Sequence, residues 1–405
     1  MAVWLSIGIL FTFTAIAFII YRWGNMKCIG VTPVRKFTFI AILFTSGLDV
    51  GLIMFPLTEF AGYADLVNSP EYAFSNPLAI EFGFWAFLIW AFYFLTSFYF
   101  CVIEPRVKFF EIPLIKFINN VVIIGTCAFT AYLLLTNLPW YLPDLGDGKS
   151  IVGSFYVIVF VVIAAAVYSS TNIRYVRILS LVSTWLFLGL IALMWAGAFL
   201  SDKSSVGEFF TTFALLGDYF GNIENFVLPI NEYHEFYLFW WFAWSIMIGQ
   251  FTARFVSGMR TYQVLFAMMV FPSIPIAIWF SVLYYYSANA IPTVGLYNLA
   301  MVIVGVTFVI NSLDSLVRLY TDNLNLTVQR FGKARYIIGN ITLISGLTLL
   351  FKLDFLQIQW VGALAIGLIL GCFAYILKNH YHTVADIERS PIGNKIDFTK
   401  IEVAS

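Results

Sequence analysis

Long apolar stretches separated by short polar connections run through most of the 405-residue chain. A helix that spans a membrane needs about twenty mainly apolar residues. By that measure the sequence predicts an all-α polytopic membrane protein. The eleven predicted spans are residues 3–21, 37–58, 79–103, 113–138, 151–169, 178–200, 232–253, 262–286, 294–317, 336–352 and 357–377.

Composition and charge agree with this pattern. The chain is 61% apolar and 11% charged, which excludes an ordinary soluble domain. Its formal net charge of zero gives no case for binding nucleic acid. Of the 22 lysines and arginines, all but Lys149, Lys203 and Lys352 fall on one side of the predicted membrane. The positive-inside rule then predicts a multi-pass cell-membrane protein in a lipid bilayer, with the N-terminus outside and the C-terminus cytoplasmic.

Three further segments of the chain carry few functional signals. Residues 1–22 form an extra N-terminal span that we expect to be retained, because no cleavage signal follows it. The connection 201–231 has apolar residues at helical spacing, so we expect an outer amphipathic segment in the interface or against a neighbouring subunit. Residues 378–405 are polar and are expected to form a cytoplasmic tail.

The richest aromatic stretch runs from Tyr237 to Gln250 and contains Trp240, Trp241 and Trp244. At 100° per residue these indoles lie on one side of a helix. An aromatic belt at the membrane surface is one interpretation, because tryptophans gather at headgroups. A stacked indole surface for a cationic ligand is the other, because indole gives the strongest cation–π attraction.

A second aromatic cluster favours the ligand interpretation. The third span reads F-W-A-F-L-I-W-A-F-Y and places Trp85, Trp90 and Tyr93 on one broad helical stripe. One such stripe is typical of packing. Two tryptophan-rich helices in one chain favour a shared aromatic box.

The second span contains the signals of an interrupted helix. Gly47, Gly51 and Pro56 lie within ten residues of one another. Asp49 lies between the two glycines, and an ionisable residue at that depth costs about 3 kcal/mol on insertion scales, so it is a candidate functional residue. A hydrogen bond across a helix interface is the structural alternative. Glu59 is near the outer end, which favours a structural role.

Two further polar groups lie within apolar helices. In the ninth span, F-V-I-N-S-L-D-S carries Asn311 and Ser312 three and four residues after Phe308, and this patch could coordinate a cation or bond a neighbouring helix. Thr126 and Thr130 share a face of the fourth span. Hydrogen bonds back to their own helix are the simpler interpretation of that pair.

These patches together resemble the betaine/carnitine/choline transporter family of secondary transporters. That family's tryptophan signature, followed by a glycine, A-R and R-T, matches W-W-F-A-W-S-I-M-I-G-Q-F-T-A-R-F-V-S-G-M-R-T from Trp240 to Thr261. Its second aromatic helix matches Trp85, Trp90 and Tyr93. Its glycine-rich helix and its F-x-x-T-S-A-D-S segment are similar to residues 47–59 and 308–315, and the four patches occur in the family's order.

The resemblance implies a fold of two inverted five-helix repeats, residues 37–200 and 232–377, with the first helix of each repeat partly unwound. It also implies a homotrimer and alternating access. The implied substrate site consists of Trp85, Trp90, Tyr93, Trp240, Trp241, Trp244, Gly47 and Gly51. The implied ion-coupling site consists of Asp49, Thr126, Thr130, Phe308, Asn311 and Ser312.

The chain departs from the family's pattern at three places. The family's first helix has no counterpart, Asp49 replaces the central glycine of the glycine-rich motif, and Asn311 replaces a threonine of the sodium-binding pair. Sodium coupling is therefore less expected than coupling to a proton.

Two functions from different classes follow. The first is a secondary active transporter of a quaternary-ammonium or methylated-amine zwitterion (betaine-, choline- or carnitine-like), coupled to a proton or sodium and without a cofactor. The second is a non-transporting protein with the same fold, acting as a sensor or as a membrane subunit of a larger complex. An enzyme is not expected, because the spans show no nucleophile–base pair and no metal-ligand cluster.

Overall fold

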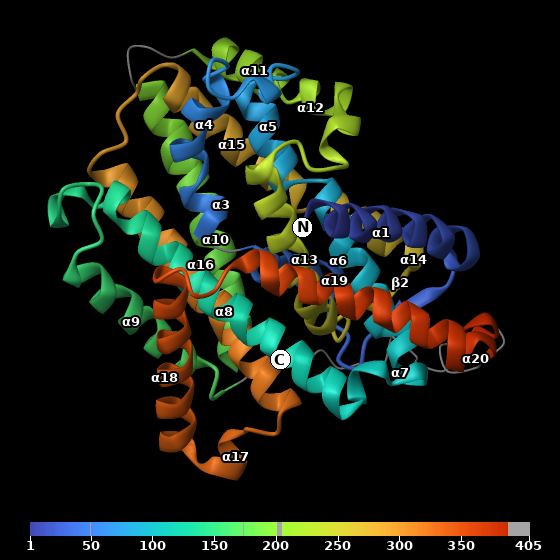
Figure 1. Ribbon diagram of the computed structural model, residues 1–405. Helices are drawn as coiled ribbons and strands as arrows, with labels where there is room; N and C mark the ends of the chain where they lie inside the picture. Colours follow the sequence, from blue (N-terminus) through green and yellow to red (C-terminus); the bar gives the residue numbers. More distant parts are fainter. Residues whose placement is uncertain (49, 173, 201–204, 388–405) are drawn as a thin grey trace.

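The computed structural model describes residues 1–48, 50–172, 174–200 and 205–387. This part of the chain is α-helical apart from one two-stranded ribbon. Eight of its helical segments are long and apolar enough to cross a membrane, by length and composition. The protein is therefore an all-α polytopic membrane protein (Figure 1).

The first half contains α1 (Ala2–Trp23), β1 (Lys27–Ile29), α2 (Lys36–Gly47), α3 (Val50–Met54), α4 (Pro56–Ala64), α5 (Pro77–Trp85), α6 (Leu88–Phe98), α7 (Glu104–Val107), α8 (Pro113–Tyr141), α9 (Gly153–Ser169) and α10 (Arg174–Leu200). The second half contains α11 (Val206–Ala214), α12 (Gly217–Gly221), α13 (Glu232–Thr252), β2 (Ser257–Arg260), α14 (Thr261–Val270), α15 (Ser273–Ala288), α16 (Leu296–Asn323), α17 (Val328–Phe331), α18 (Lys333–Lys352), α19 (Ile358–Tyr375) and α20 (Tyr381–Ala385). Short 3-10 or π turns lie at η1 (Pro70–Tyr72), η2 (Tyr99–Ile103), η3 (Phe109–Glu111), η4 (Pro143–Leu145), η5 (Ile223–Phe226) and η6 (Ile376–His380).

Each of the eleven predicted spans contains helix, but three of them are divided. The predicted span 37–58 is divided into α2, α3 and α4, as its glycines and proline indicate. The predicted span 262–286 bends between α14 and α15 at Pro272. The expectation that the first helix of each repeat is unwound is wrong for the second repeat, because α13 runs unbroken from Glu232 to Thr252.

The division of the second span exposes backbone carbonyls, and side chains from other helices meet them. Leu48 is extended, with φ −128° and ψ 159°, and so ends α2. The Thr45 carbonyl accepts from Asn311 Nδ2 at 3.0 Å, the Gly47 carbonyl from Tyr93 Oη at 3.1 Å and the Leu48 carbonyl from Ser312 Oγ at 3.0 Å. Non-helical backbone is tolerated at membrane depth only where protein surrounds it, as it does here.

Pro56 also leaves a backbone carbonyl without its helical hydrogen bond. It has no N–H, so the Leu52 carbonyl four residues earlier cannot make its helical hydrogen bond. Trp279 Nε1 on α15 donates to that carbonyl at 2.9 Å. The Met54 carbonyl also lacks its helical hydrogen bond, because the Thr58 amide donates to the Phe55 carbonyl instead. Tyr141 Oη on α8 donates to the Met54 carbonyl at 2.8 Å.

The third span is also interrupted. The sequence analysis expected one continuous helix with an aromatic stripe from Trp85 to Tyr93, and it did not predict this break. α5 ends at Trp85 and α6 begins at Leu88, with Phe87 in a left-handed conformation at φ 55°. The Phe87 amide, which leaves the helical pattern, donates to Ser273 Oγ at 2.9 Å. The stripe therefore consists of two helices that meet at an angle.

Contacts between connections link segments that are distant in the sequence. β1 and β2 pair antiparallel, joining the connection after α1 to the connection after α13. At the other end, Asn76 Nδ2 donates to Asp218 at 2.7 Å, and α11 and α12 lie with α4, α5 and α15 at the top of Figure 1. The amphipathic connection thus packs on its own chain, with Phe209 against Trp195 and Tyr285.

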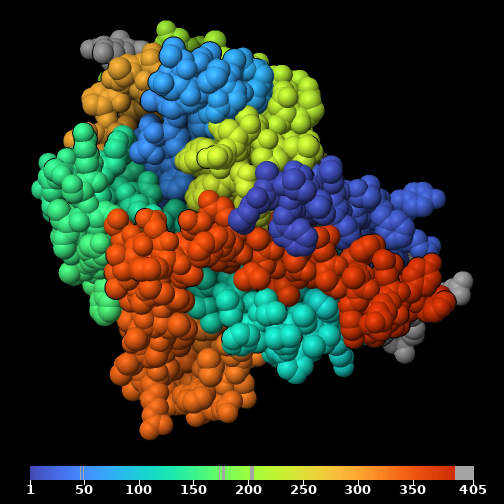
Figure 2. All heavy atoms as spheres, viewed as in Figure 1, coloured from blue at the N-terminus to red at the C-terminus, as the bar shows by residue number. Residues whose placement is uncertain are grey.

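The C-terminal region differs from the prediction of a tail that starts at residue 378. Helix continues from α19 through η6 and α20 to Ala385, whose carbonyl accepts from Arg22 Nη2 at 3.2 Å. Figure 2 shows α1 and α19–α20 side by side across one face of the molecule. Residues 388–405 lie outside the described part of the chain.

We expect Tyr141→Phe to lower the free energy of unfolding by about 1 kcal/mol, because it leaves the buried Met54 carbonyl without its donor. Thermal unfolding of the purified protein measures this. Tyr262→Phe is the matched control, because the Tyr262 side chain is 42% exposed. Equal melting temperatures for the two variants would show that the Met54 carbonyl does not need Tyr141.

Candidate functional site

Three of the predicted indoles form one cluster between α5 and α13. Trp240 and Trp241 are stacked, with ring centroids 4.9 Å apart and planes 9° from parallel. Trp85 meets both edge-on, at 5.4 Å from Trp240 and 5.1 Å from Trp241. All three side chains are almost fully buried, so this is not an aromatic belt at a membrane surface.

Hydrogen bonds and neighbouring rings fix this cluster in place. Trp241 Nε1 donates to the Phe84 carbonyl at 2.8 Å, next to the interruption of the third span. Phe55 and Tyr237 complete the box, with centroids 5.9 Å and 5.6 Å from Trp85. The sequence analysis did not assign these two residues to the site, although each is three or four residues from a predicted member.

The remaining aromatic members form an adjoining group on α6. Trp90 and Tyr93 meet edge-on at 5.2 Å, and Tyr93 lies 6.4 Å from Trp241, which joins the two groups. The Tyr93 hydroxyl donates to the Gly47 carbonyl. The structure therefore brings the aromatic helices to the interrupted helix, as the sequence predicts.

The two predicted glycines allow this close approach. A Cβ on Gly51 would overlap the Trp85 ring and lie 3.0 Å from the Trp240 ring. A Cβ on Gly47 would lie 3.1 Å from the Trp90 ring. Larger residues at either position would push the backbone of α2 and α3 away from the rings.

Trp244 is buried on the same helix, one turn beyond Trp240. Among the described residues, none of the ring contacts of the box involves it. Within the same part of the chain, the indole N–H groups of Trp90, Trp240 and Trp244 are buried without a hydrogen-bond partner. An indole N–H that is left unbonded at a candidate site can serve a polar ligand atom.

The predicted ion-coupling residues divide into two sets. Asn311 and Ser312 on α16 reach the interrupted helix through the Thr45 and Leu48 carbonyls, and Ser180 Oγ donates to Asn311 Oδ1 at 3.2 Å. Asp49 lies outside the described residues. The structure thus places two of the predicted residues directly beside the division of the second span.

The second set consists of Phe308, Thr126 and Thr130. Thr126 Oγ1 and Thr130 Oγ1 donate to carbonyls four residues earlier on α8, as in the simpler interpretation of that pair. Phe308 is fully buried, and its ring meets Phe44 and Phe187. These contacts do not join the three residues to Asn311 and Ser312.

A carboxylate cluster adjoins the box. Its member Glu59 was expected to have a structural role, and its member Glu81 was not considered in the sequence analysis. Glu59 accepts hydrogen bonds from Tyr63 at 2.6 Å, from Tyr237 at 3.0 Å and from Tyr233. Tyr63 Oη also lies 2.9 Å from Glu81 Oε2, and Glu81 is fully buried. The only signal in the sequence was the four-residue spacing of Glu81 from Trp85.

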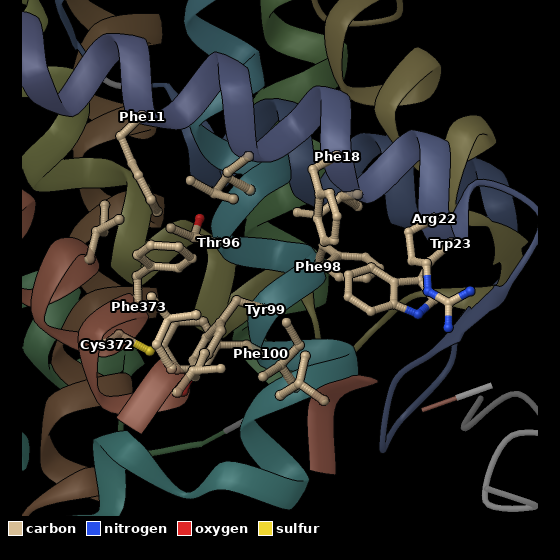
Figure 3. Close-up of a pocket in the computed structure, with 18 of the residues that line it drawn as sticks. Phe11, Phe18, Arg22, Trp23, Thr96, Phe98, Tyr99, Phe100, Cys372 and Phe373 are labelled. Carbon is tan, nitrogen blue, oxygen red and sulfur yellow. The ribbon is translucent and has the colours of Figure 1, made fainter. Parts of the chain in front are cut away.

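A large cavity lies elsewhere in the molecule. It has a volume of about 670 Å³ and is lined by mainly apolar residues of α1, α6, η2, α19 and α20. Figure 3 shows Phe11, Phe18, Trp23, Phe98 and Phe373 around it. The indoles of the aromatic box do not line this cavity.

We expect Gly51→Ala to destabilise the protein by about 1–3 kcal/mol and to displace the Trp85 ring, because there is no room for the added methyl group. Thermal unfolding measures this effect. Gly62→Ala on the adjoining helix α4 is the matched control, because a Cβ there meets nothing within 4 Å. If both variants are as stable as the wild type, the close approach of Gly51 to the indoles is wrong.

Comparison with known proteins identifies two relatives. The chain is 24% identical to glycine betaine transporter 1 of Vibrio parahaemolyticus over 319 aligned residues. The alignment covers 69% of this chain and 60% of that protein. It is 25% identical over 302 residues to an uncharacterized transporter of Haemophilus influenzae, which covers 64% and 44%. The match thus spans about half the length of these relatives. No family model matches the chain. The similarity to a glycine betaine transporter agrees with the tryptophan and glycine motifs and confirms the resemblance to the betaine/carnitine/choline transporter family.

Proposed function

We propose that this protein is a secondary active transporter of a quaternary-ammonium or methylated-amine zwitterion. The observation that carries the proposal is the buried contact of Trp85 with the stacked pair Trp240 and Trp241. Indole faces attract a desolvated cation by about 2 kcal/mol or more. The name of the Vibrio relative points to the same substrate class.

The box requires movement before it can hold a ligand. The ring centroids of Trp85 and Trp241 are only 5.1 Å apart, and Gly51 lies so close to the Trp85 ring that a Cβ on it would overlap the ring. A trimethylammonium group between these rings must part them. We propose that the segment from α3 to α4, which carries Gly51 and Phe55, moves away from α5 when the substrate enters.

Two arrangements from the resemblance remain proposals of the same kind. One is a pair of inverted five-helix repeats, residues 37–200 and 232–377, and the other is a homotrimer. We also propose an outside N-terminus and a cytoplasmic C-terminus, which protease treatment of tags at both ends tests. The pairing of β1 with β2 supports this topology, since the two connections must then share one side of the membrane.

We further propose that transport is coupled to a proton. The Thr45 and Leu48 carbonyls, which could otherwise coordinate a sodium ion, accept hydrogen bonds from Asn311 and Ser312. Asp49 stays a proton carrier on sequence grounds, because a carboxylate at that depth is costly unless it is neutralised. Its position lies outside the described residues.

An inward proton gradient should therefore stimulate uptake of radiolabelled betaine into proteoliposomes, without a need for sodium. Asp49→Asn should lose the stimulation and keep substrate binding, because the amide cannot take up a proton. Strict sodium dependence of the wild type would contradict proton coupling. A variant that still responds to the gradient would remove Asp49 from the mechanism.

The alternative is a protein that binds the same ligand without moving it, as a sensor or as a membrane subunit. The close packing of Trp85 on Trp240 and Trp241, with ring centroids 5.4 and 5.1 Å away, would suit such a protein if the box stayed closed. Counterflow of radiolabelled betaine separates the two functions. A transporter exchanges internal for external betaine, whereas a sensor binds betaine without flux.

Replacing Trp241 by Leu should weaken betaine binding about thirtyfold, because it removes a ring worth about 2 kcal/mol to the cation. Isothermal titration calorimetry on the purified protein measures this. Trp185→Leu is the control, because Trp185 on α10 is 68% exposed and far from the box in sequence. Unchanged affinity in Trp241→Leu, Trp85→Leu and Trp90→Leu would assign these tryptophans to packing alone.

A further inference from the structure

Two carboxylates from neighbouring helices meet at one tyrosine beside the aromatic box. Tyr63 Oη lies 2.6 Å from Glu59 Oε2 and 2.9 Å from Glu81 Oε2. Glu59 and Tyr63 are one turn apart on α4, and Glu81 is on α5. Glu59 is half-buried, whereas Glu81 is completely buried.

The number of protons in this group can be counted from its hydrogen bonds. A phenol has one O–H and can donate to only one acceptor at a time. Two ionised carboxylates would both need to accept from Tyr63, so one of the two contacts would lack a proton. A carboxyl O–H that donates to Tyr63 Oη resolves the conflict.

The surroundings indicate which carboxyl holds that proton. Glu59 also accepts from Tyr233 and Tyr237, as an ionised carboxylate does. Among the described residues, no donor in full hydrogen-bond geometry reaches the buried Glu81 Oε1, although the Trp85 indole and the Glu59 carboxyl group also interact with Glu81. A buried carboxylate oxygen without a donor is far more costly than the carbonyl oxygen of a neutral acid, so the proton belongs on Glu81.

Among the described residues, the other titratable groups near the pair are tyrosines and one histidine. Tyr72 of η1 and Tyr141 of α8 also lie near the pair. From α13, His234 stacks on Phe84 at 4.4 Å, and its Nδ1 accepts from the Ile230 amide. Neither of the ion pairs Lys116–Glu111 and Arg318–Asp314 involves Glu59 or Glu81.

We propose that Glu81, Tyr63 and Glu59 form a proton-binding site in which the proton on Glu81 bonds to Tyr63 and Tyr63 bonds to Glu59. Its use as a coupling site rests on the proposed transport function. Half-buried Glu59 is the entry point, and the proton reaches Glu81 by transfer through the Tyr63 hydroxyl. Each transfer moves one proton and leaves the total charge of the carboxylate pair at −1.

This proton also affects the aromatic box. Loss of the proton leaves two carboxylates on α4 and α5 that repel each other and share one donor. Tyr237, which bonds to Glu59, contacts the rings of Trp85 and Trp240 at 5.6 and 5.7 Å. Protonation therefore holds α4 on α5 with the box closed, and deprotonation favours the separation that substrate entry requires.

Infrared spectroscopy of the purified full-length protein tests the site without any substrate. A protonated carboxyl group absorbs separately from ionised carboxylates and shifts in heavy water. We expect the difference spectrum between the wild type and Glu81→Gln at neutral pH to contain such a band, because any contribution of a protonated Asp49 is present in both proteins and cancels. Glu104→Gln is the matched control, because Glu104 accepts from Tyr99 Oη at 2.5 Å and from the Phe110 amide, with no carboxylate in its hydrogen bonds among the described residues.

Tyr63→Phe tests the geometry and keeps both carboxyl groups. We expect its band to remain and to shift in frequency, because the Glu81 O–H loses its acceptor. A difference spectrum between the wild type and Glu81→Gln that lacks this band, or a band that Tyr63→Phe leaves unmoved, would overturn the proposal. So would a wild type that lacks the band and shows a sodium-induced thermal shift abolished by Glu81→Gln. If betaine, choline and carnitine all fail to bind the protein, the proposed transport function is wrong. The infrared band then still tests whether Glu81 holds a proton.

Discussion

Backbone carbonyls inside the membrane need hydrogen-bond donors, and the arrangement of the helices around the second span depends on this constraint. The second predicted span is divided twice, and five of its carbonyls accept from Asn311, Tyr93, Ser312, Trp279 and Tyr141. These donors come from four different helices. The irregular segment therefore determines where α6, α8, α15 and α16 lie, and it brings the flexible glycine backbone against the indoles.

The aromatic box and the carboxylate pair are built from the same three helices. α5 contributes Trp85 and, one turn earlier, Glu81, and α13 contributes Trp240, Trp241 and Tyr237. The segment from α3 to α4 contributes Phe55 and Glu59, which are also one turn apart. The same helix contacts therefore hold the carboxylates near each other and the rings together. A change in the charge of the carboxylates acts directly on access to the indoles.

Sequence periodicity and composition predicted the all-α membrane fold, the division of the second span and the six aromatic residues as candidates. They could not predict the interruption at Phe87, because no glycine or proline marks it and its amide is satisfied by the distant Ser273. Glu81 was missed because one glutamate near the end of a span is unremarkable until Tyr63 and Glu59 lie beside it. The tertiary contact, and not the local sequence, makes these residues significant.

The β1–β2 ribbon has a mechanical consequence. Beyond the paired strands, Gly30 and Thr32 donate to the Val256 and Arg254 carbonyls, and the Thr261 amide donates to Met26. A Cβ on Gly30 would overlap the backbone at Arg254, so the two connections touch without a gap. The contact extends to the Val34 amide, which donates to the Phe255 carbonyl at 3.2 Å. This clasp joins the C-terminal ends of α1 and α13 to the start of α14. If the helices move during transport, these three ends are the ones that move together, and the chain is first released from the contact at Arg35, directly before α2.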